Sequence, residues 1–153
     1  MTSPAVEVWF YHLERSGADE VLPPLLDRTL QRGWRAVVRT ADAARLPTLD
    51  ARLWTARPDL VTPHGRADAP HADRQPVVLT TGEENPNGAQ ALFLLDGAEA
   101  GPLEGWSRVL DLFDGRDDSA VAAARERWRG LRGRGAALAY WTQTEAGRWE
   151  KRA

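Results

Sequence analysis

The sequence predicts an α/β domain in which helices flank a mostly parallel central sheet, Rossmann-like in outline. Two observations lead to this prediction. Short apolar runs of strand length alternate along the chain with segments of helical periodicity. The chain also has 153 residues, of which 42% are hydrophobic, and this suffices for one compact core. We therefore expect a single layered domain over residues 1–153.

The first half of the chain shows the pattern of strand, helix, strand and helix. Residues 6–13 form a dense apolar run, which predicts a buried strand. A helix is expected over residues 19–33 and a second strand over residues 35–40, and handedness rules favour a parallel pair for such a βαβ unit. A second helix is expected over residues 41–54, with Pro47 limiting it.

The middle of the chain contains a predicted surface loop and two further strands. Residues 57–75 are rich in Pro, Gly, Asp and His without apolar periodicity, which favours a loop. Residues 77–81 and 91–95 predict two buried strands. The linker between them is too short for a helix, so these strands either pair directly or lie apart in the sheet.

The last third predicts a strand over residues 106–113 and a helix over residues 120–132. An Asp-Asp-Ser sequence at 117–119 is a candidate cap for that helix. Residues 136–141 predict a final strand, and residues 149–152 follow a turn after it.

Composition excludes several classes of protein. The chain has no cysteine, so it holds neither a disulfide framework nor a thiolate metal site. Its net charge of -2 lacks the basic balance of a dedicated nucleic-acid binder. Glu7 interrupts the first apolar stretch and no run is long enough to span a membrane, so we expect a cytoplasmic location.

A nucleotide site is not favoured, because the glycines that cradle phosphates are missing where the first strand meets the first helix. Residues 13–19 contain one glycine and two carboxylates, and a carboxylate at a helix N-terminus repels a phosphate. We expect no cofactor and no catalytic residue.

Three smaller groups of polar residues have alternative interpretations. His64 and His71 lie near two aspartates in the predicted loop, but their spacing matches no zinc pattern, so we expect no metal site. The pair Glu83 and Glu84 could act as acid and base if buried, but a solvated loop tip is favoured. His12 is equally consistent with a satisfied core histidine and with a functional group at a strand end.

The predicted C-terminal helix has the clearest candidate site. Five arginines face only Glu126 in return: Arg125, Arg127, Arg129, Arg132 and Arg134. At about 100° per residue, Arg125, Arg129 and Arg132 share one narrow face. Val121 and Trp128 lie along its border. Such a face suits a ligand that combines carboxylates with an apolar anchor, and a solvated helix face is the equally weighted alternative.

Several stretches of the sequence resemble the chi subunit family of the bacterial DNA polymerase III holoenzyme. They are Leu53-Trp54 leading to Pro63-His64-Gly65, Leu79-Thr80-Thr81-Gly82-Glu83-Glu84-Asn85-Pro86-Asn87-Gly88, Ala124-Arg125-Glu126-Arg127-Trp128-Arg129, and the ending Tyr140-Trp141 with Gly147-Arg148-Trp149-Glu150-Lys151. Their order and spacing fit the family, and the likeness extends over nearly the whole chain.

This resemblance implies a protein without catalytic activity of its own, working within a DNA-directed DNA polymerase complex during DNA replication. In the family, the subunit links the clamp-loader assembly to single-stranded DNA-binding protein by gripping that protein's acidic, phenylalanine-terminated tail. It also pairs with a small subunit named psi, a second implied partner, and DNA contact is then indirect. By matching position, the tail-binding residues are Arg125, Trp128, Arg129 and Arg132, with Val121 at the rim.

Two other classes of function remain as alternatives. A small-ligand or nucleotide-binding α/β enzyme would need a crevice at the carboxyl ends of the strands, with perturbed titratable groups in it. A direct binder of single-stranded nucleic acid would need exposed aromatic side chains and would bind with a steep salt dependence.

Overall fold

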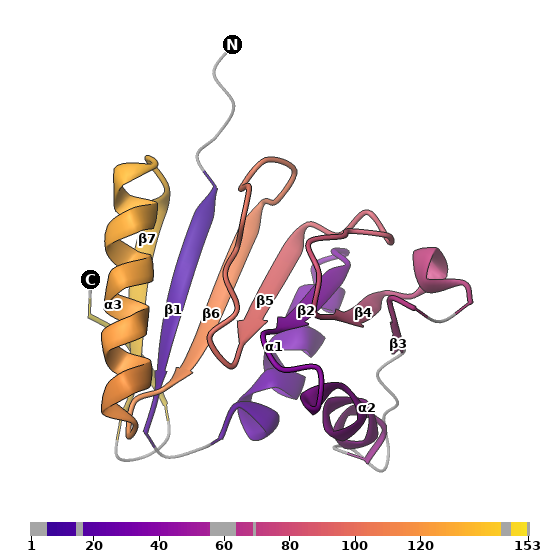
Figure 1. Cartoon of the computed structure of the whole chain (residues 1–153), viewed down its shortest axis with the longest axis horizontal. Helices are drawn as coiled ribbons and strands as arrows, with labels where there is room; N and C mark the ends of the chain where they lie inside the picture. Colours follow the sequence, from indigo (N-terminus) through magenta and orange to yellow (C-terminus); the bar gives the residue numbers. More distant parts are fainter. Residues whose placement is uncertain (1–5, 15–16, 56–63, 69, 145–147, 153) are drawn as a thin grey trace.

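The structure is a computed structural model, which describes residues 6–14, 17–55, 64–68, 70–144 and 148–152. In these residues, eight strands form one sheet in the order β3-β4-β2-β5-β6-β1-β7-β8 (Figure 1). Every neighbouring pair is parallel except the antiparallel pair of β7 and β8. The predicted fold class, a mostly parallel sheet flanked by helices, is confirmed.

The strands are β1 (Glu7–Leu13), β2 (Ala36–Thr40), β3 (His64–Arg66), β4 (Val77–Thr80), β5 (Ala91–Leu95), β6 (Arg108–Asp114), β7 (Ala137–Gln143) and β8 (Trp149–Lys151). The α-helices are α1 (Ala18–Gln31), α2 (Arg45–Thr55) and α3 (Asp118–Gly133), and a short 3-10 helix, η1, covers Ala72–Arg74.

The predicted pairing of the first two strands needs a correction. β1 and β2 do run parallel, but β5 and β6 lie between them in the sheet. Helix α1 therefore crosses two strands before the chain returns to the sheet. The later strands insert into the middle of the sheet because their apolar runs are buried on both faces, as central parallel strands require.

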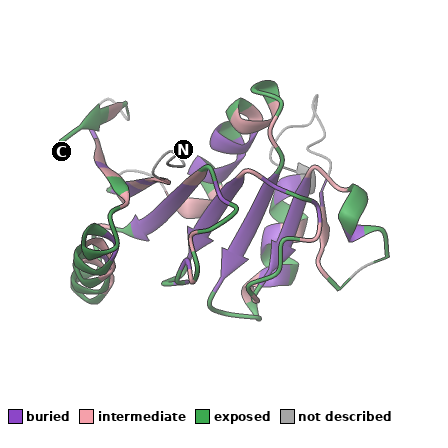
Figure 2. Cartoon of the chain, turned by 90° about the horizontal axis from the view of Figure 1, so that it is seen from above, coloured by how far each residue is buried: buried purple, intermediate pink, exposed green. Residues whose placement is uncertain are grey.

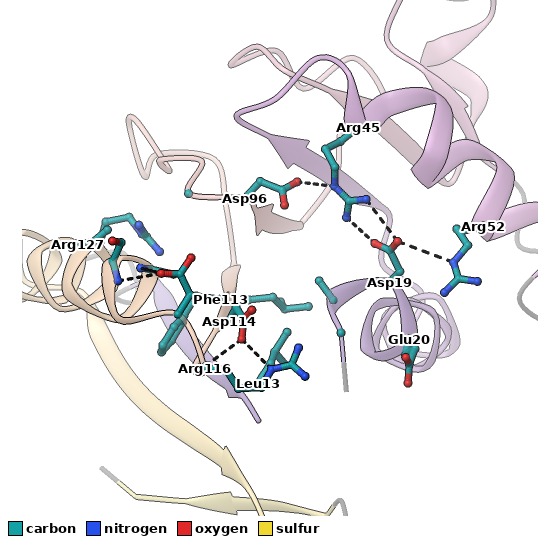
Figure 3. A pocket seen from close by; sticks show the side chains of 18 residues that line it. Leu13, Asp19, Glu20, Arg45, Arg52, Asp96, Phe113, Asp114, Arg116 and Arg127 are labelled. Carbon is teal, nitrogen blue, oxygen red and sulfur yellow. Dashed lines mark hydrogen bonds and ion pairs between the residues drawn. The ribbon is translucent and has the colours of Figure 1, made fainter. Parts of the chain in front are cut away.

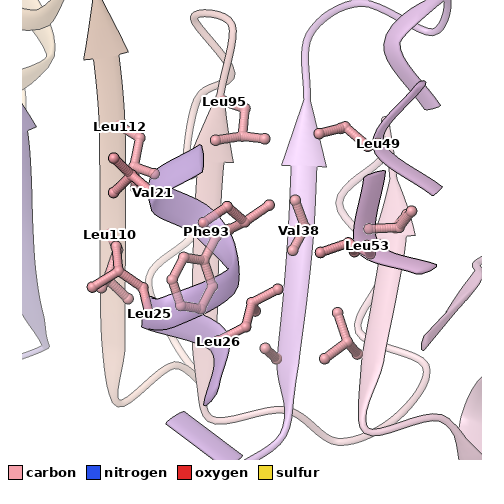
Figure 4. Packing of buried hydrophobic residues seen from close by; sticks show 14 of the residues in the cluster. Val21, Leu25, Leu26, Val38, Leu49, Leu53, Phe93, Leu95, Leu110 and Leu112 are labelled. Carbon is pink, nitrogen blue, oxygen red and sulfur yellow. The ribbon is translucent and has the colours of Figure 1, made fainter. Parts of the chain in front are cut away.

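The helices cover both faces of the sheet. Residues of α1 and α2 share one buried cluster with inward side chains of β2, β5 and β6, whereas residues of α3 belong to a second cluster. Figure 4 shows Val21 and Leu25 of α1 over Leu110 and Leu112 of β6. Full burial of each such leucine or valine stabilises the fold by about 1.5–3 kcal/mol.

The neighbouring strands β1 and β6 are followed by helices on opposite faces. β1 is followed by α1, and β6 is followed by α3. Such a reversal opens a crevice at the carboxyl ends of the two strands, where open α/β sheets generally bind ligands.

The linker between β4 and β5 resolves the question that the sequence left open. The two strands lie apart, because both pair with β2, one on each side. Asn87, which is buried, holds this linker by donating from its side-chain amide to the carbonyls of Ala36 and Gln75, at 3.2 and 2.9 Å. Asn87 thus ties the linker to the start of β2 and to the segment just before β4.

Three other predicted boundaries change. The surface loop expected over residues 57–75 contains the short parallel edge strand β3, and the loop prediction is wrong there; residues 57–63 and 69 lie outside the described residues. Helix α2 begins at Arg45 rather than residue 41, so Pro47 lies in its first turn, where a missing N–H is tolerated. Helix α3 begins at Asp118, two residues before the predicted start.

None of the helices in the described part of the chain is long and apolar enough to cross a membrane.

Candidate partner-binding site

Helix α3 is fixed against the sheet by its cap and by its inner face. Asp117 is the N-cap, and its carboxylate accepts hydrogen bonds from the backbone N–H groups of Ser119 and Ala120. Ala124 and Leu131 are buried against the sheet, while the other side of α3 is exposed (Figure 2). After the helix, Gly135 adopts a φ of 78°, a conformation that favours glycine. The polar face of α3 is therefore presented to solvent in a fixed orientation.

A cavity of about 250 Å³ lies beside this exposed face. It is mainly apolar, and α3, β6 and β7 contribute its lining residues, which are Phe113, Val121, Ala124, Arg125, Trp128 and Tyr140. A dry cavity of about 150 Å³ can hold benzene. The space beside α3 is therefore large enough for one aromatic side chain.

Trp128 forms one wall of this cavity and is held by two aromatic contacts. Its ring lies edge-on to Phe10, with centroids 5.4 Å apart, and to Tyr140, at 5.9 Å. Edge-to-face pairs of this kind each contribute about 0.5–1.5 kcal/mol beyond the burial of area. The ring is half-buried and its orientation is set before any partner arrives.

The arginines of α3 extend from the cavity along the exposed face. Arg125 lines the cavity, whereas Arg129 and Arg132 lie outside its lining. Arg129 forms an ion pair with Glu126. Within the described residues, Arg125 and Arg132 have no ion-pair partner, so both guanidinium groups can receive an external carboxylate.

One arginine of the predicted patch is structural. Arg127 points to the sheet and binds the buried Asp111 through two hydrogen bonds, Nε to Oδ2 at 2.7 Å and Nη2 to Oδ1 at 3.0 Å. Burial raises the pKa of the Asp111 carboxyl, and the hydrogen bonds from Arg127 oppose that rise. The prediction that Arg127 meets no carboxylate besides Glu126 is wrong, because β6 supplies its partner.

His12 does not line the cavity but contacts Tyr140, which does. Its Nδ1 lies 2.6 Å from the hydroxyl of Tyr140, and its Nε2 lies 3.1 Å from the carboxylate of Glu14. Burial raises the pKa of the Tyr140 phenol, while the nearby Arg125 opposes that rise. Of the two interpretations of His12, the structure favours a histidine at the end of a strand. Its contacts with Tyr140 and Glu14 orient the Tyr140 wall of the cavity.

The crevice at the carboxyl ends of β1 and β6 is larger, about 670 Å³, but its charges are balanced internally (Figure 3). Arg45 binds Asp19 at 2.5 Å and Asp96 at 3.1 Å, and Arg52 lies 3.8 Å from Asp19. The hydrogen bond with Asp19 raises the pKa of Arg45. A phosphate in this crevice would have to displace carboxylates from the arginines, which disfavours the nucleotide-binding alternative.

The other polar clusters form no shared site. His64 is buried and lies 2.8 Å from the carboxylate of Asp50, whereas His71 is exposed. In the part of the chain that the structure describes, no group of three or more His, Cys, Asp or Glu side chains could hold a metal ion. Glu83 and Glu84 are both exposed, and Glu84 accepts a hydrogen bond from the hydroxyl of Thr80. The side chain of Trp54 lies outside the described residues.

The structure thus brings together three of the five predicted site residues, Val121, Arg125 and Trp128, and adds three that the sequence did not reveal. Phe113 and Tyr140 come from β6 and β7, and Ala124 lies on the inner side of α3. The apolar runs around positions 113 and 140 were visible in the sequence. Nothing in them indicated that β7 lies beside β1 and carries Tyr140 to α3.

Comparison with known proteins identifies the family of this chain. The sequence model described as "DNA polymerase III chi subunit, HolC" matches residues 6–139. The DNA polymerase III subunit chi of Pseudomonas aeruginosa is 30% identical over 111 residues, which cover 72% of this chain and 76% of that protein. The probable DNA polymerase III subunit chi of Rickettsia prowazekii is 26% identical over 85 residues, which cover 56% of this chain and 52% of that protein.

The fold and the site define an α/β domain that has an internally paired crevice and an open pocket beside its C-terminal helix. The sequence matches place this chain in the class of replication proteins that are subunits of DNA polymerase III. Within this class, the chain belongs to the chi subunit family, whose sequence model matches most of its length.

Proposed function

We propose that this chain is a non-catalytic subunit that binds the acidic, phenylalanine-terminated tail of single-stranded DNA-binding protein and links it to the clamp-loader assembly. The observation that carries the proposal is the apolar cavity between Trp128 and Tyr140. At its edge lies the guanidinium of Arg125, which has no ion-pair partner among the described residues. An aromatic side chain beside a carboxylate matches both features of this site.

The ligand would be held in two parts. The terminal phenyl ring enters the cavity and contacts Phe113, Val121 and Trp128. The terminal carboxylate and the preceding acidic side chains pair with Arg125 and, further along α3, with Arg132 and Arg129. Arg129 already has Glu126 as a partner, so it contributes less than the other two. The psi subunit is proposed as a second partner, without an assigned surface.

The proposal predicts modest affinity that falls as ionic strength rises, because the arginines on α3 are exposed and their ion pairs are screened by salt. The hydrophobic part of the interaction changes much less with salt. Unchanged affinity between low and high salt would contradict the proposed role of the arginines.

The experiment is a fluorescence titration with an acidic peptide that ends in proline and phenylalanine with a free carboxylate. A second peptide lacks the phenylalanine, and the protein is compared with Arg132→Ala and Arg125→Ala variants. We expect saturable binding that requires the phenylalanine and that weakens roughly five- to tenfold in each variant.

The matched control is Arg116→Ala, which removes an exposed arginine that pairs with Asp114 near the start of α3. This variant should bind the peptide within about twofold of the unchanged protein, since the remaining field effect is screened. Absence of binding by the unchanged protein at low salt would refute the proposed function and leave the family membership intact.

A further inference from the structure

A second cavity, of about 220 Å³, lies on the face of the sheet opposite α3. It is located between the last turns of α1 and the strands β1, β5 and β6. Its lining combines three arginines with three aromatic side chains, and the ones used below are Arg28, Arg32, Arg108, Trp9, Tyr11 and Trp34.

The arginines and tryptophans alternate in an arginine–tryptophan ladder made of Arg32, Trp34, Arg108 and Trp9. The guanidinium carbon of Arg32 lies 4.3 Å from the ring centre of Trp34. That of Arg108 lies 5.3 Å from Trp34 and 3.8 Å from Trp9. Cation–π contacts at these distances hold the planar groups in place.

Aromatic side chains continue from the ladder across the next strands. The ring centroids of Trp9 and Trp141 of β7 lie 5.7 Å apart, and those of Tyr11 and Trp149 of β8 lie 4.8 Å apart. The three tryptophans in these contacts are only half-buried. Lys151 pairs with Trp141 across the β7–β8 ladder and so lies on the same face of the sheet. The surface thus has flat apolar groups bordered by cations.

Carboxylates of the described residues balance little of the positive charge at this cavity. Arg28 and Arg32 are exposed, and neither has an ion-pair partner among the described residues. Arg108 has one, Glu7, at 3.0 Å. In the crevice, by contrast, every described arginine is paired with a carboxylate. An anionic ligand at this second cavity would therefore meet two guanidinium groups, those of Arg28 and Arg32, that no carboxylate of the described residues neutralises.

We propose that this surface binds single-stranded nucleic acid, with phosphates on Arg28 and Arg32 and bases against the ladder and the neighbouring tryptophans. Bases have flat π faces that stack on indole and guanidinium planes. Acidic side chains have no such face, and this favours nucleic acid over an acidic peptide. The proposal concerns the opposite face of the sheet from the α3 cavity and is independent of tail binding.

The net charge of -2 limits the affinity expected for single-stranded nucleic acid. A chain with this overall balance is not a dedicated nucleic-acid binder, so a local cluster of arginines gives weak binding that is detectable at low salt. Such a weak contact would contribute when another interaction already holds the protein near the nucleic acid. The second contact is then intramolecular and benefits from a high effective concentration.

The test measures fluorescence anisotropy of a labelled single-stranded 12-mer of thymidine at several low salt concentrations. The variant Arg28→Ala/Arg32→Ala removes two exposed cations, and Arg74→Ala/Arg116→Ala removes two exposed arginines elsewhere as the matched control. We expect the first variant to bind about tenfold more weakly, with the slope of log affinity against log salt reduced by about two. The control should stay within about twofold of the unchanged protein.

The same variants are titrated with an acidic peptide that lacks phenylalanine. Peptide binding that is lost in Arg28→Ala/Arg32→Ala but kept in the control, together with 12-mer binding that does not change in either double variant, would reassign the surface to acidic protein segments and overturn the proposal. No binding of the 12-mer at the lowest salt, or equal losses in the two double variants, would also overturn it.

Discussion

The crevice at the carboxyl ends of β1 and β6 and the cavity beside α3 differ in how their charges are balanced. In the crevice, each described arginine has a carboxylate within 4 Å, as in the pairs of Arg45 with Asp19 and Arg127 with Asp111. Beside α3, Arg125 and Arg132 have no such partner within the described residues, and the adjoining cavity is mainly apolar. The larger depression is therefore the less suited to an anion, and the smaller one is open to a ligand.

This difference indicates that the crevice is a feature of the fold, whereas the cavity beside α3 is the candidate for function. The reversal of helices beside β1 and β6 creates a crevice in any sheet of this topology, whether or not it binds a ligand. Here the crevice residues bind one another and stabilise the junction of helices and strands. The following predictions test whether the crevice residues are structural and the residues beside α3 bind the ligand, beginning with the largest expected effect.

Replacing Arg127 by methionine should destabilise the protein most. The change leaves the carboxyl of Asp111, only 2% exposed, without its partner, and breaking a buried pair in this way costs about 3–5 kcal/mol. Chemical denaturation measures the free energy of unfolding. Arg116→Ala, which breaks an exposed pair, should lose less than about 1 kcal/mol.

A double variant sharpens this result. In Arg127→Met/Asp111→Leu, no charge remains buried at this position, so much of the lost stability should return. If Arg127→Met were as mild as Arg116→Ala, the assignment of Arg127 to structure rather than to ligand binding would be wrong.

Replacing Trp128 by alanine should affect both stability and selectivity. The ring is half-buried and contacts Phe10 and Tyr140, so we expect a loss of about 2 kcal/mol, less than for a fully buried tryptophan. The preference for a peptide with a terminal phenylalanine should also disappear. Trp128→Phe should restore most of both properties, and a full preference in Trp128→Ala would place the phenylalanine elsewhere.

Replacing Asp117 by alanine tests a crevice residue. Asp117 caps α3 through two backbone N–H groups, so its loss should cost about 1 kcal/mol in the free energy of unfolding. Affinity for the tail peptide should not change while the protein is folded. Asp118→Ala, which removes an acidic residue from the first turn without touching the cap, should cost only a few tenths of a kcal/mol. Equal losses in both variants would exclude the cap as the cause.

The smallest effect concerns the two tyrosines. Burial raises the pKa of Tyr11 to about 12 and also raises that of Tyr140 above 10. Because the folded-state values are higher than the unfolded value of about 10, the stabilisation is fully present below pH 10 and is lost as pH rises through the folded-state values. Ultraviolet absorbance should show that less than half of the tyrosine is ionised at pH 10, and Tyr140→Phe should leave a single transition near pH 12. A full transition at pH 10 would contradict the burial of both phenols.

The sequence predicted the elements better than their arrangement. Apolar runs such as residues 91–95 identify buried strands, but periodicity carries no information about which strands are neighbours, and β5 and β6 separate the expected pair. Strand β3 was missed because three residues that include Gly65 give no apolar run. The linker held by Asn87 was also invisible, since its hydrogen bonds reach residues far away in the chain.

The candidate site was predicted in part for the same reason. Helical spacing predicts a face of Arg125, Arg129 and Arg132 with Val121 and Trp128 along its border. Of these residues, Val121, Arg125 and Trp128 line the cavity. The partner of Arg127 and the walls formed by Phe113 and Tyr140 depend on tertiary contacts between distant segments, which local spacing does not encode.

The central claim is that the tail binds beside α3 and not in the crevice, and a nuclear magnetic resonance titration tests it most directly. Backbone amide shifts are followed while the phenylalanine-terminated peptide is added to the unchanged protein. If the tail binds beside α3, the largest shifts should fall at Val121, Arg125, Trp128 and Tyr140. Largest shifts at Asp19, Asp96 and Gly97 would instead place the ligand in the crevice and refute binding beside α3.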